Sequence, residues 1–255
     1  MGKNKLLRWA ELETLDNVIQ PSELKPGSDH KIKGKWKSEI FRNENPIVLE
    51  LACGKGEYTI GLSGIFPDRN FIGVDIKGAR MWRGAKTARE RQLKNVAFLR
   101  TRIEFINCFF ACDEVDEIWI TFPDPHQGKR NSNKRLTCPW FLNIYRNFLK
   151  NKGIIHLKTD NKELFAYTKK LVKDNGLELL FSTDDYYSAS VINEVALKNI
   201  YSESDMNSTM ELILDKILSI KTHYEKGFLK EGLAINYLAF RLDKNRFICH
   251  GWDKI

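Results

Sequence analysis

Two acidic residues flank a glycine-rich turn that follows the first apolar run of the chain. The run 47–51 contains Glu50, the turn holds Gly54 and Gly56, and Asp75 closes the next apolar run. Because glycine has no side chain, backbone N–H groups in such a turn can approach a ligand closely. A carboxylate in the position of Asp75 accepts hydrogen bonds from the two hydroxyls of a ribose. The spacing therefore predicts a nucleoside-binding site.

The same turn argues against a bound pyrophosphate. A dinucleotide-binding turn needs a further glycine three residues after the second one, and this chain has Thr59 there. Glu50 would repel a phosphate but would suit a ligand that carries positive charge. The expected ligand is an unphosphorylated, cationic adenosine compound, and S-adenosylmethionine fits that description.

Polar residues also follow two later apolar runs. Asp124 stands between two prolines after the run 118–122 and precedes a basic cluster, and Asp160 follows the run 153–158. A third polar segment, 221–226, precedes the last apolar run. Ligands of open α/β sheets bind beyond the carboxyl ends of the strands, so we expect these segments at the ligand site.

Apolar runs and amphipathic stretches alternate from residue 46 onward, which predicts strands alternating with helices. The expected strands are 47–51, 70–75, 96–99, 118–122, 153–158, 177–182 and 234–242. The expected helices are 58–65, 77–93, 140–149, 164–175 and 206–218, with Met81, Ala85, Ala88 and Gln92 on the packing face of the second. This alternation predicts an α/β fold, a single Rossmann-like domain with a mostly parallel, seven-stranded sheet and helices on both faces.

We divide the chain into an N-terminal arm, residues 1–45, and one domain, residues 46–255. The arm is polar and mixed in charge, and its apolar residues Leu6, Leu7, Trp9 and Leu12 are spaced for a short helix. We expect this arm to have little core of its own.

The composition excludes several classes of protein. With 255 residues, 42% of them hydrophobic, the chain can bury one sizeable core. No window of about 18 apolar residues could span a membrane, and the first residues do not resemble a signal peptide. Five scattered cysteines without a CxxC pair argue against a disulfide framework or a zinc site. We expect a cytoplasmic protein with no membrane contact and no bound metal.

The net charge of +8 is unevenly distributed. Nine basic residues and one acid fall within 77–102, four basic residues fall within 129–135, and six acids without a base fall within 103–125. A charged helix is often only a solvated face, but two basic clusters separated by an acidic stretch favour a polyanionic partner.

Leu49 to Gly56, together with Asp75, resemble the first two motifs of class I S-adenosylmethionine-dependent methyltransferases. The later segments are more specific. They are an Asp-Pro step at 124–125 followed by lysines and arginines, Lys-Thr-Asp-Asn at 158–161, and Thr-His-Tyr-Glu at 222–225. This combination resembles the bacterial tRNA (guanine-N7-)-methyltransferase family over about residues 46–241.

The resemblance implies methyl transfer from S-adenosylmethionine to N7 of a guanosine in tRNA, at position 46 of the variable loop. N7 carries an in-plane lone pair, so the transfer needs alignment of the reactants and no general base. The implied cofactor-binding residues are Glu50, Gly54, Gly56, Asp75, Glu104 and Asp124, and Asp124 is also the implied catalytic residue. The implied substrate-binding residues are Gly128, Lys129, Asp160, Thr222, His223, Tyr224 and Glu225, and the implied RNA-binding residues are Arg130, Lys134 and Arg135.

The chain departs from the family pattern at three positions of the site, and one of them is His126, which follows the Asp-Pro step where the family has a tryptophan. The family has an Asp-Ala step after the third strand, whereas this chain has Arg102-Ile103-Glu104, and we place Glu104 in the role of the aspartate. The family has a lysine four residues after the active-site aspartate, whereas this chain has Gly128, and we take Lys129 as the substitute. The stretch 194–220 is also longer than the family norm.

Other functions stay open at this point. The enzyme could methylate a small basic metabolite, although the basic clusters argue against that substrate. The chain could also be a non-catalytic RNA-binding module that lost a cofactor contact at Arg102. Asp124 and Asp160 could cap a turn and a helix, and Cys53 fits the turn by its small size without acting as a nucleophile. The sequence does not predict whether the protein is a monomer or a homodimer.

Overall fold

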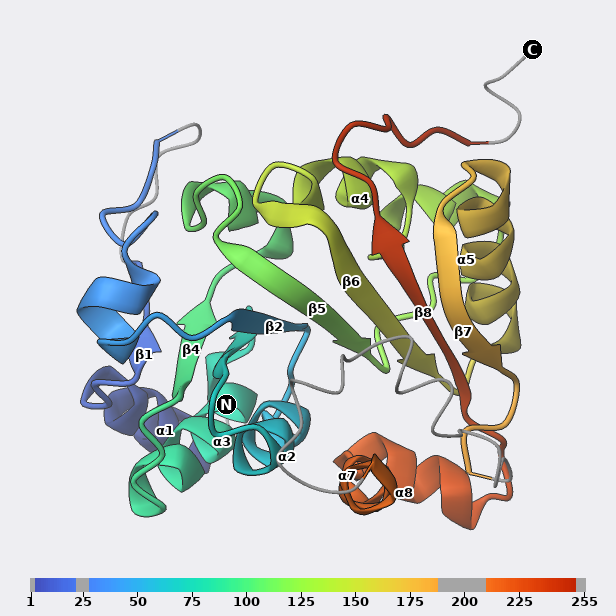
Figure 1. The fold of residues 1–255 in the computed structure, drawn as a ribbon. Helices are drawn as coiled ribbons and strands as arrows, with labels where there is room; N and C mark the ends of the chain where they lie inside the picture. The colour runs from blue at the N-terminus through green and yellow to red at the C-terminus, as the bar shows by residue number, and fades with distance from the viewer. Residues whose placement is uncertain (1–2, 22–27, 188–209, 251–255) are drawn as a thin grey trace.

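The apolar runs of the sequence lie side by side in one sheet, shown in Figure 1. This computed structural model describes residues 3–21, 28–187 and 210–250. The strands are β1 (Val18–Ile19), β2 (Ile47–Leu51), β3 (Asn70–Asp75), β4 (Val96–Arg100), β5 (Val115–Thr121), β6 (Leu149–Thr159), β7 (Glu178–Thr183) and β8 (Asn236–Leu242). Their order is β1-β4-β3-β2-β5-β6-β8-β7. The pairs from β1 to β6 are parallel, and β8 pairs antiparallel with both β6 and β7.

All seven predicted strands are present, and an eighth comes from the N-terminal segment. The five residues of β2 and the six of β3 are buried throughout, as expected for parallel strands covered on both faces. The strand predicted at 118–122 is β5 and begins earlier, at Val115. The additional strand is β1, which pairs with β4 through Val18 and Ile19.

Helices cover both faces of the sheet. One face carries α1 (Lys3–Glu13), α2 (Glu57–Ile65), α3 (Gly78–Glu90) and α7 (Met210–Ser219). The other face carries α4 (Pro139–Tyr145), α5 (Lys162–Asp174) and two short helices, the π-helix η1 (Trp36–Phe41) and the 3₁₀-helix η2 (Ile103–Cys108). A further 3₁₀-helix, η3 (Lys129–Lys134), follows β5, and α8 (His223–Lys230) lies beyond the arrowheads of β5 and β6 in Figure 1.

The helices differ from the predicted ones at three places. The helix expected over 140–149 ends at Tyr145, because β6 already begins at Leu149. Met81, Ala85 and Ala88 are buried as predicted, but α3 ends at Glu90 and leaves Gln92 exposed. The helix expected from residue 206 is described only from Met210, and residues 206–209 lie outside the described part of the chain.

The N-terminal segment adds side chains to the core of the domain. Trp36 is fully buried, its indole N–H donates to the Phe109 carbonyl at 2.8 Å, and its ring stacks on Phe110. The Glu114 carboxylate accepts from the backbone N–H groups of Gly34 and Trp36. The segment therefore packs against the domain and builds no separate core, and the boundary at residue 45 stays a prediction. Among the described residues, no helix is long and apolar enough to cross a membrane.

We predict that Trp36→Ala lowers the free energy of unfolding by about 3–5 kcal/mol, because it removes a large buried ring and leaves the Phe109 carbonyl without its donor. Urea denaturation followed by circular dichroism measures the effect. Trp140→Ala is the control, because Trp140 is 51% exposed, and it should cost less than about 1 kcal/mol. Equal losses in the two variants would show that the N-terminal segment does not contribute to the core.

Candidate active site

The turn after β2 has an unusual backbone. Ala52, Gly54 and Gly56 have positive φ angles of 58°, 56° and 72°. A Cβ atom on Gly56 would lie 2.7 Å from the ring of Phe98, so this position also has no room for a side chain. The turn is therefore pressed against β4, and its path is fixed by packing as well as by backbone conformation.

Glu50 lies beneath this turn and is buried. Its Oε2 accepts from the backbone N–H of Thr59 at 2.8 Å and from the Thr59 hydroxyl at 2.5 Å, and its Oε1 accepts from the Thr121 hydroxyl at 2.7 Å. Burial raises the pKa of Glu50 to about 7, although these donors oppose the shift. The carboxylate is not part of the pocket lining described below, so it can act on a ligand only through its charge and through the elements that it joins.

Asp75 ends β3 beside the turn, as predicted. Its Oδ2 accepts from the backbone N–H of Gly54 at 2.9 Å, and its Oδ1 accepts from the backbone N–H of Lys77 at 2.7 Å. Each carboxylate oxygen can accept a second hydrogen bond. The carboxylate is thus held in one orientation with its remaining lone pairs available to a ribose.

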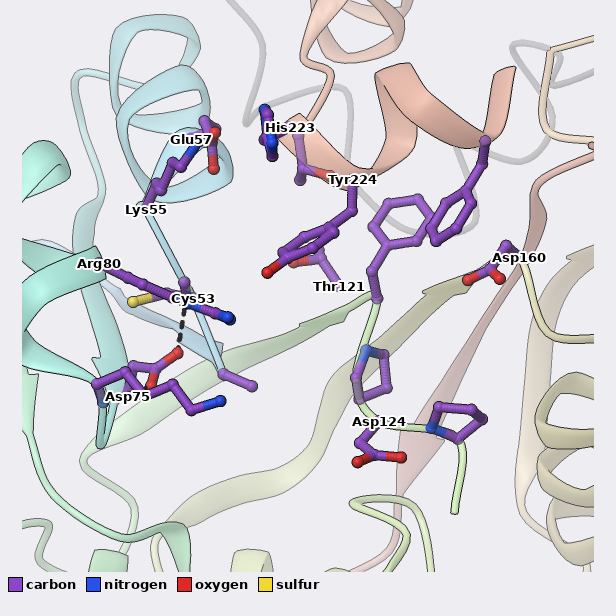
Figure 2. Close-up of a pocket in the computed structure, with 18 of the residues that line it drawn as sticks. Cys53, Lys55, Glu57, Asp75, Arg80, Thr121, Asp124, Asp160, His223 and Tyr224 are labelled. Atoms are coloured by element: carbon purple, nitrogen blue, oxygen red, sulfur yellow. Dashed lines mark hydrogen bonds between the residues drawn. The ribbon is translucent and has the colours of Figure 1, made fainter. Parts of the chain in front are cut away.

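A pocket of about 490 Å³ opens at the carboxyl ends of the central strands. Figure 2 shows its walls, which come from the turn after β2, the ends of β3, β5 and β6, and the start of α8. The lining residues are Ala52, Cys53, Gly54, Lys55, Glu57, Asp75, Ile76, Lys77, Arg80, Thr121, Phe122, Pro123, Asp124, Pro125, Asp160, Thr222, His223, Tyr224 and Phe228. The three polar segments expected at the ligand site therefore meet there.

The loop that carries Asp124 is held in a strained conformation. Phe122 and His126 have positive φ angles of 48° and 43°, which non-glycine residues seldom adopt. The Asp124 side chain is 74% exposed, and its Oδ1 accepts from the backbone N–H of His126 at 3.1 Å. Strain of this kind persists only where the surroundings enforce it.

Arg135 holds this loop through its guanidinium, and its contact with RNA stays a prediction that its burial does not support. It is only 2% exposed. Its guanidinium donates to the Pro125 carbonyl at 3.1 Å, to the His126 carbonyl at 3.2 Å and to the Glu163 carboxylate at 2.5 Å. With its donors turned inward, Arg135 fixes the Asp124 loop and presents no charge to a phosphate.

Asp160 follows β6 and faces the pocket across from Asp124 in Figure 2. It is partly buried, and this burial raises the pKa of its carboxyl above the usual range. The alternative role of Asp160, as the cap of the following helix, is taken by Asn161. The Oδ1 of Asn161 accepts from the Leu164 backbone N–H at 2.8 Å at the start of α5. Asp160 therefore lines the pocket without serving as the cap of α5.

The start of α8 forms the opposite wall. Thr222, His223 and Tyr224 line the pocket, and the guanidinium of Arg80 lies 5.7 Å from the centre of the Tyr224 ring. Glu225 points the other way and is fully buried, where it forms a capping box with Thr222. Glu225 therefore has a structural role in this helix cap and does not line the pocket, and its contact with substrate stays a prediction.

Other predicted site residues lie outside the pocket lining. Glu104 is exposed on η2, forms an ion pair with Arg102 at 3.4 Å and does not line the pocket, and its role as the substitute for a cofactor-binding aspartate stays a prediction. Gly128 and Lys129 stand at the start of η3, with Arg130 and Lys134 exposed on the same short helix. Their contacts with substrate and RNA stay predictions.

Several lining residues were not singled out from the sequence. Glu57 is the first residue of α2, directly after the turn, and Thr121 holds Glu50 from the end of β5. Lys77 and Arg80 were counted only as part of a basic cluster, although their spacing of three puts them on one side of α3, at its start. Because both residues follow Asp75 closely in the sequence, this spacing could have predicted that they lie at the pocket.

The described part of the pocket contains neither a reactive thiol nor a metal cluster. Burial raises the pKa of Cys53 well above its usual range, and the nearby carboxylate of Glu50 adds to the shift. The thiol therefore stays protonated at neutral pH and is a poor nucleophile. Within residues 3–21, 28–187 and 210–250, no group of three or more His, Cys, Asp or Glu side chains could hold a metal ion.

The proteins that are similar to this chain are methyltransferases. A family model described as "Putative methyltransferase" matches residues 44–187. A tRNA (guanine-N(7)-)-methyltransferase of Bacteroides fragilis is 47% identical over 95% of this chain and 87% of its own length, and one of Christiangramia forsetii is 47% identical over 94% of this chain and 99% of its own. A solved structure of an antibiotic-related methyltransferase has a TM-score of 0.52 at 14% identity, covering 86% of this chain and 98% of that one, and supports the fold alone. The resemblance noted in the sequence is thereby confirmed, and the chain belongs to the tRNA (guanine-N(7)-)-methyltransferase family.

Proposed function

We propose that this protein transfers a methyl group from S-adenosylmethionine to N7 of a guanosine in tRNA, at position 46 of the variable loop. The observation that carries the proposal is that Asp75, Asp124 and Asp160, from the ends of three strands, line one pocket. In this pocket, the end of β3 with Asp75 is suited to a nucleoside, and the carboxylates of Asp124 and Asp160 are available to a second ligand. Family membership supports the same reaction.

The residues around the turn fit S-adenosylmethionine. Asp75 would hold the ribose hydroxyls, and the backbone around Gly54 would lie against the rest of the nucleoside. The turn lacks the third glycine of a pyrophosphate site, and the acids Glu50 and Glu57 favour a cation nearby. When bound, this cofactor supplies an electrophilic methyl group on a positively charged sulfur.

The protein side of the reaction consists of alignment and charge. N7 attacks with its own lone pair, so no residue has to remove a proton first. Methylation leaves positive charge on the purine, and a carboxylate close to that ring becomes a stronger partner as the charge develops. Asp124 and Asp160 both line the pocket, and we take them as the source of such carboxylates.

Asp160 is the better candidate for selecting guanine. A carboxylate can accept from both the N1–H and the exocyclic N–H of guanine, whereas adenine has no N1–H to offer. Because Asp160 is half-buried, an unpaired carboxylate would be costly there, which penalises the wrong base. Asp124, being more exposed, would orient the base from the cofactor side.

Two groups of basic residues come from segments that adjoin the pocket lining in the sequence. Lys77 and Arg80 come from the start of α3, with Arg83 exposed one turn further along, and the other group on η3 comprises Lys129, Arg130 and Lys134. Cations in two groups can bind phosphates on either side of a nucleotide whose base enters the pocket. Lifting that base from its stack costs a few kcal/mol, which these phosphate contacts would offset.

The reaction itself is tested by nucleoside mass spectrometry of unmodified tRNA incubated with the protein and S-adenosylmethionine. We expect 7-methylguanosine, and mapping by borohydride–aniline cleavage should place it at position 46. Methylation confined to small basic metabolites, or binding of tRNA without any methylation, would reject the proposal.

We predict that Asp124→Asn and Asp160→Asn each lower kcat/KM for tRNA by about 100-fold, because each removes a carboxylate that strengthens its interaction as charge forms on guanine. Initial rates of tritiated methyl transfer measure the effect. Asp68→Asn is the matched control, because Asp68 is exposed in the turn between α2 and β3, and it should leave the rate unchanged. Near-normal rates in both site variants would remove these carboxylates from the mechanism.

We predict that affinity for S-adenosylmethionine weakens by about tenfold from pH 8 to pH 6, while affinity for S-adenosylhomocysteine changes by less than about twofold. The folded-state pKa of Glu50 is raised to about 7, so the negative charge is present above that pH and is lost below it. Only the sulfonium compound depends on that charge. Calorimetric titration at several pH values measures both affinities. In Glu50→Gln, the affinity for S-adenosylmethionine should no longer depend on pH. An unchanged pH dependence in that variant would exclude Glu50 as its source.

We predict that replacing Lys129, Arg130 and Lys134 with alanine raises KM for tRNA by at least about tenfold and lowers the slope of log affinity against log salt by about 2–3. The binding of S-adenosylhomocysteine should not change. Lys169, Lys170 and Lys173 are three exposed lysines on α5, away from the pocket, and their replacement is the matched control. If both triple variants weaken tRNA binding equally, the basic group on η3 has no specific part in docking.

A further inference from the structure

A buried ion pair lies directly behind the wall of the pocket. Lys158 is on β6, two residues before Asp160, and is fully buried. Its Nζ lies 2.6 Å from Oε1 of Glu225 and donates to the hydroxyls of Tyr58 at 3.0 Å and Tyr187 at 3.1 Å. Three acceptors thus match the three protons of the ammonium group. Burial lowers the pKa of Lys158 to about 8, with Glu225 opposing the shift, so the ammonium is charged at neutral pH.

Glu225 transmits this contact to the start of α8. Its Oε1 also accepts from the Tyr187 hydroxyl at 2.5 Å, and its Oε2 accepts from the backbone N–H of Thr222 at 3.2 Å. The Thr222 hydroxyl in turn accepts from the backbone N–H of Glu225. The same carboxylate therefore caps α8 and ties that cap to β6.

The cluster connects two walls of the pocket. One wall is the end of β6, which carries Asp160, and the other is the segment of Thr222, His223 and Tyr224, as Figure 2 shows. Apart from Lys158, no described residue of β6 forms an ion pair with α8. A buried ion pair contributes little net stability, because the desolvation of both charges offsets their attraction, but it enforces one geometry.

We propose, on the basis of the function proposed above, that Lys158 is a positioning residue for methyl transfer. It fixes the start of α8 against the end of β6, so that Tyr224 and its neighbours close on the guanosine while Asp160 holds the base from the strand end. Lys158 does not line the pocket and touches neither reactant. Its effect reaches the reaction through Glu225 and Thr222.

The test compares Lys158→Met with Lys158→Met/Glu225→Gln in single-turnover methylation of tRNA. The single variant leaves a buried carboxylate without its cation, and we expect its rate to fall by at least about tenfold. The double variant removes both charges, and the amide oxygen of the introduced glutamine can still accept from the backbone N–H of Thr222, so it should recover at least about a third of the lost rate. The dissociation constant of S-adenosylhomocysteine should change less than about threefold in both, because Gly54 and Asp75 are untouched.

Lys150→Met is the matched control. Lys150 pairs with Asp116 at the opposite end of β6, on the surface, so its loss should leave the methylation rate unchanged. If Lys158→Met does not fold, Tyr187→Phe removes one hydroxyl of the cluster and should lower the rate by about threefold. A folded Lys158→Met with a rate within about twofold of the parent would overturn the proposal, as would a parallel loss of S-adenosylhomocysteine affinity. If the parent itself does not methylate tRNA, the proposed function fails instead, which separates the two outcomes.

Discussion

The buried carboxylate of Glu50 is the constraint on which the pocket depends. A carboxylate in this position would be strongly destabilising without donors, and its donors come from two separate elements, Thr59 near the start of α2 and Thr121 at the end of β5. Satisfying one group therefore fixes where α2 begins and where β5 ends. The glycine-rich turn lies between β2 and α2, and the Asp124 loop leaves β5 directly after Thr121. The cofactor side and the catalytic side of the pocket are thus positioned by the same hydrogen bonds.

The distribution of charge matches the path of charge in methyl transfer. Positive charge begins on the sulfonium and ends on the purine, so both ends of the path favour negative charge nearby, and the pocket is lined by the carboxylates of Asp75, Asp124 and Asp160. Phosphates need the opposite sign, and the exposed cations of η3 stand outside the pocket lining. Arg80 is a cation within the pocket lining. Its guanidinium lies over the ring of Tyr224, and an aromatic face can stabilise a cation without a carboxylate. Carboxylates in the pocket lining and exposed cations on the neighbouring helix η3 suit one small region to bind both a cation and a polyanion.

The sequence was sufficient for the sheet and for the residues at its strand ends, but not for the surroundings of individual charges. Continuous apolar runs predict buried parallel strands because little else buries so many branched side chains in succession. Arg135 could not be distinguished from Arg130 in this way, because its burial depends on a carboxylate 28 positions later and on two carbonyls of a strained loop. The two-residue strand β1 is too short to give a pattern. For α8, the spacing of Thr222 and Glu225 is a recognised signature of a helix start, yet the same residues also match a ligand motif, and the structure shows the helix cap.

The two faces of β6 show how a strand can serve the core and the site together. Ile155 and Leu157 belong to the apolar core on one face, whereas His156 and Lys158 project to the other and are equally buried. His156 stacks on Trp119 at 4.0 Å between ring centres and lies 3.1 Å from Glu117. Burial would raise the pKa of Glu117, but its contacts with His156 and other donors outweigh that effect and lower it to about 2. Apolar packing tolerates small shifts, but paired charges without water do not, since each shift leaves a charge uncompensated. The polar face of β6 therefore holds the strand that carries Asp160 rigidly, while the other face of the strand packs in the apolar core.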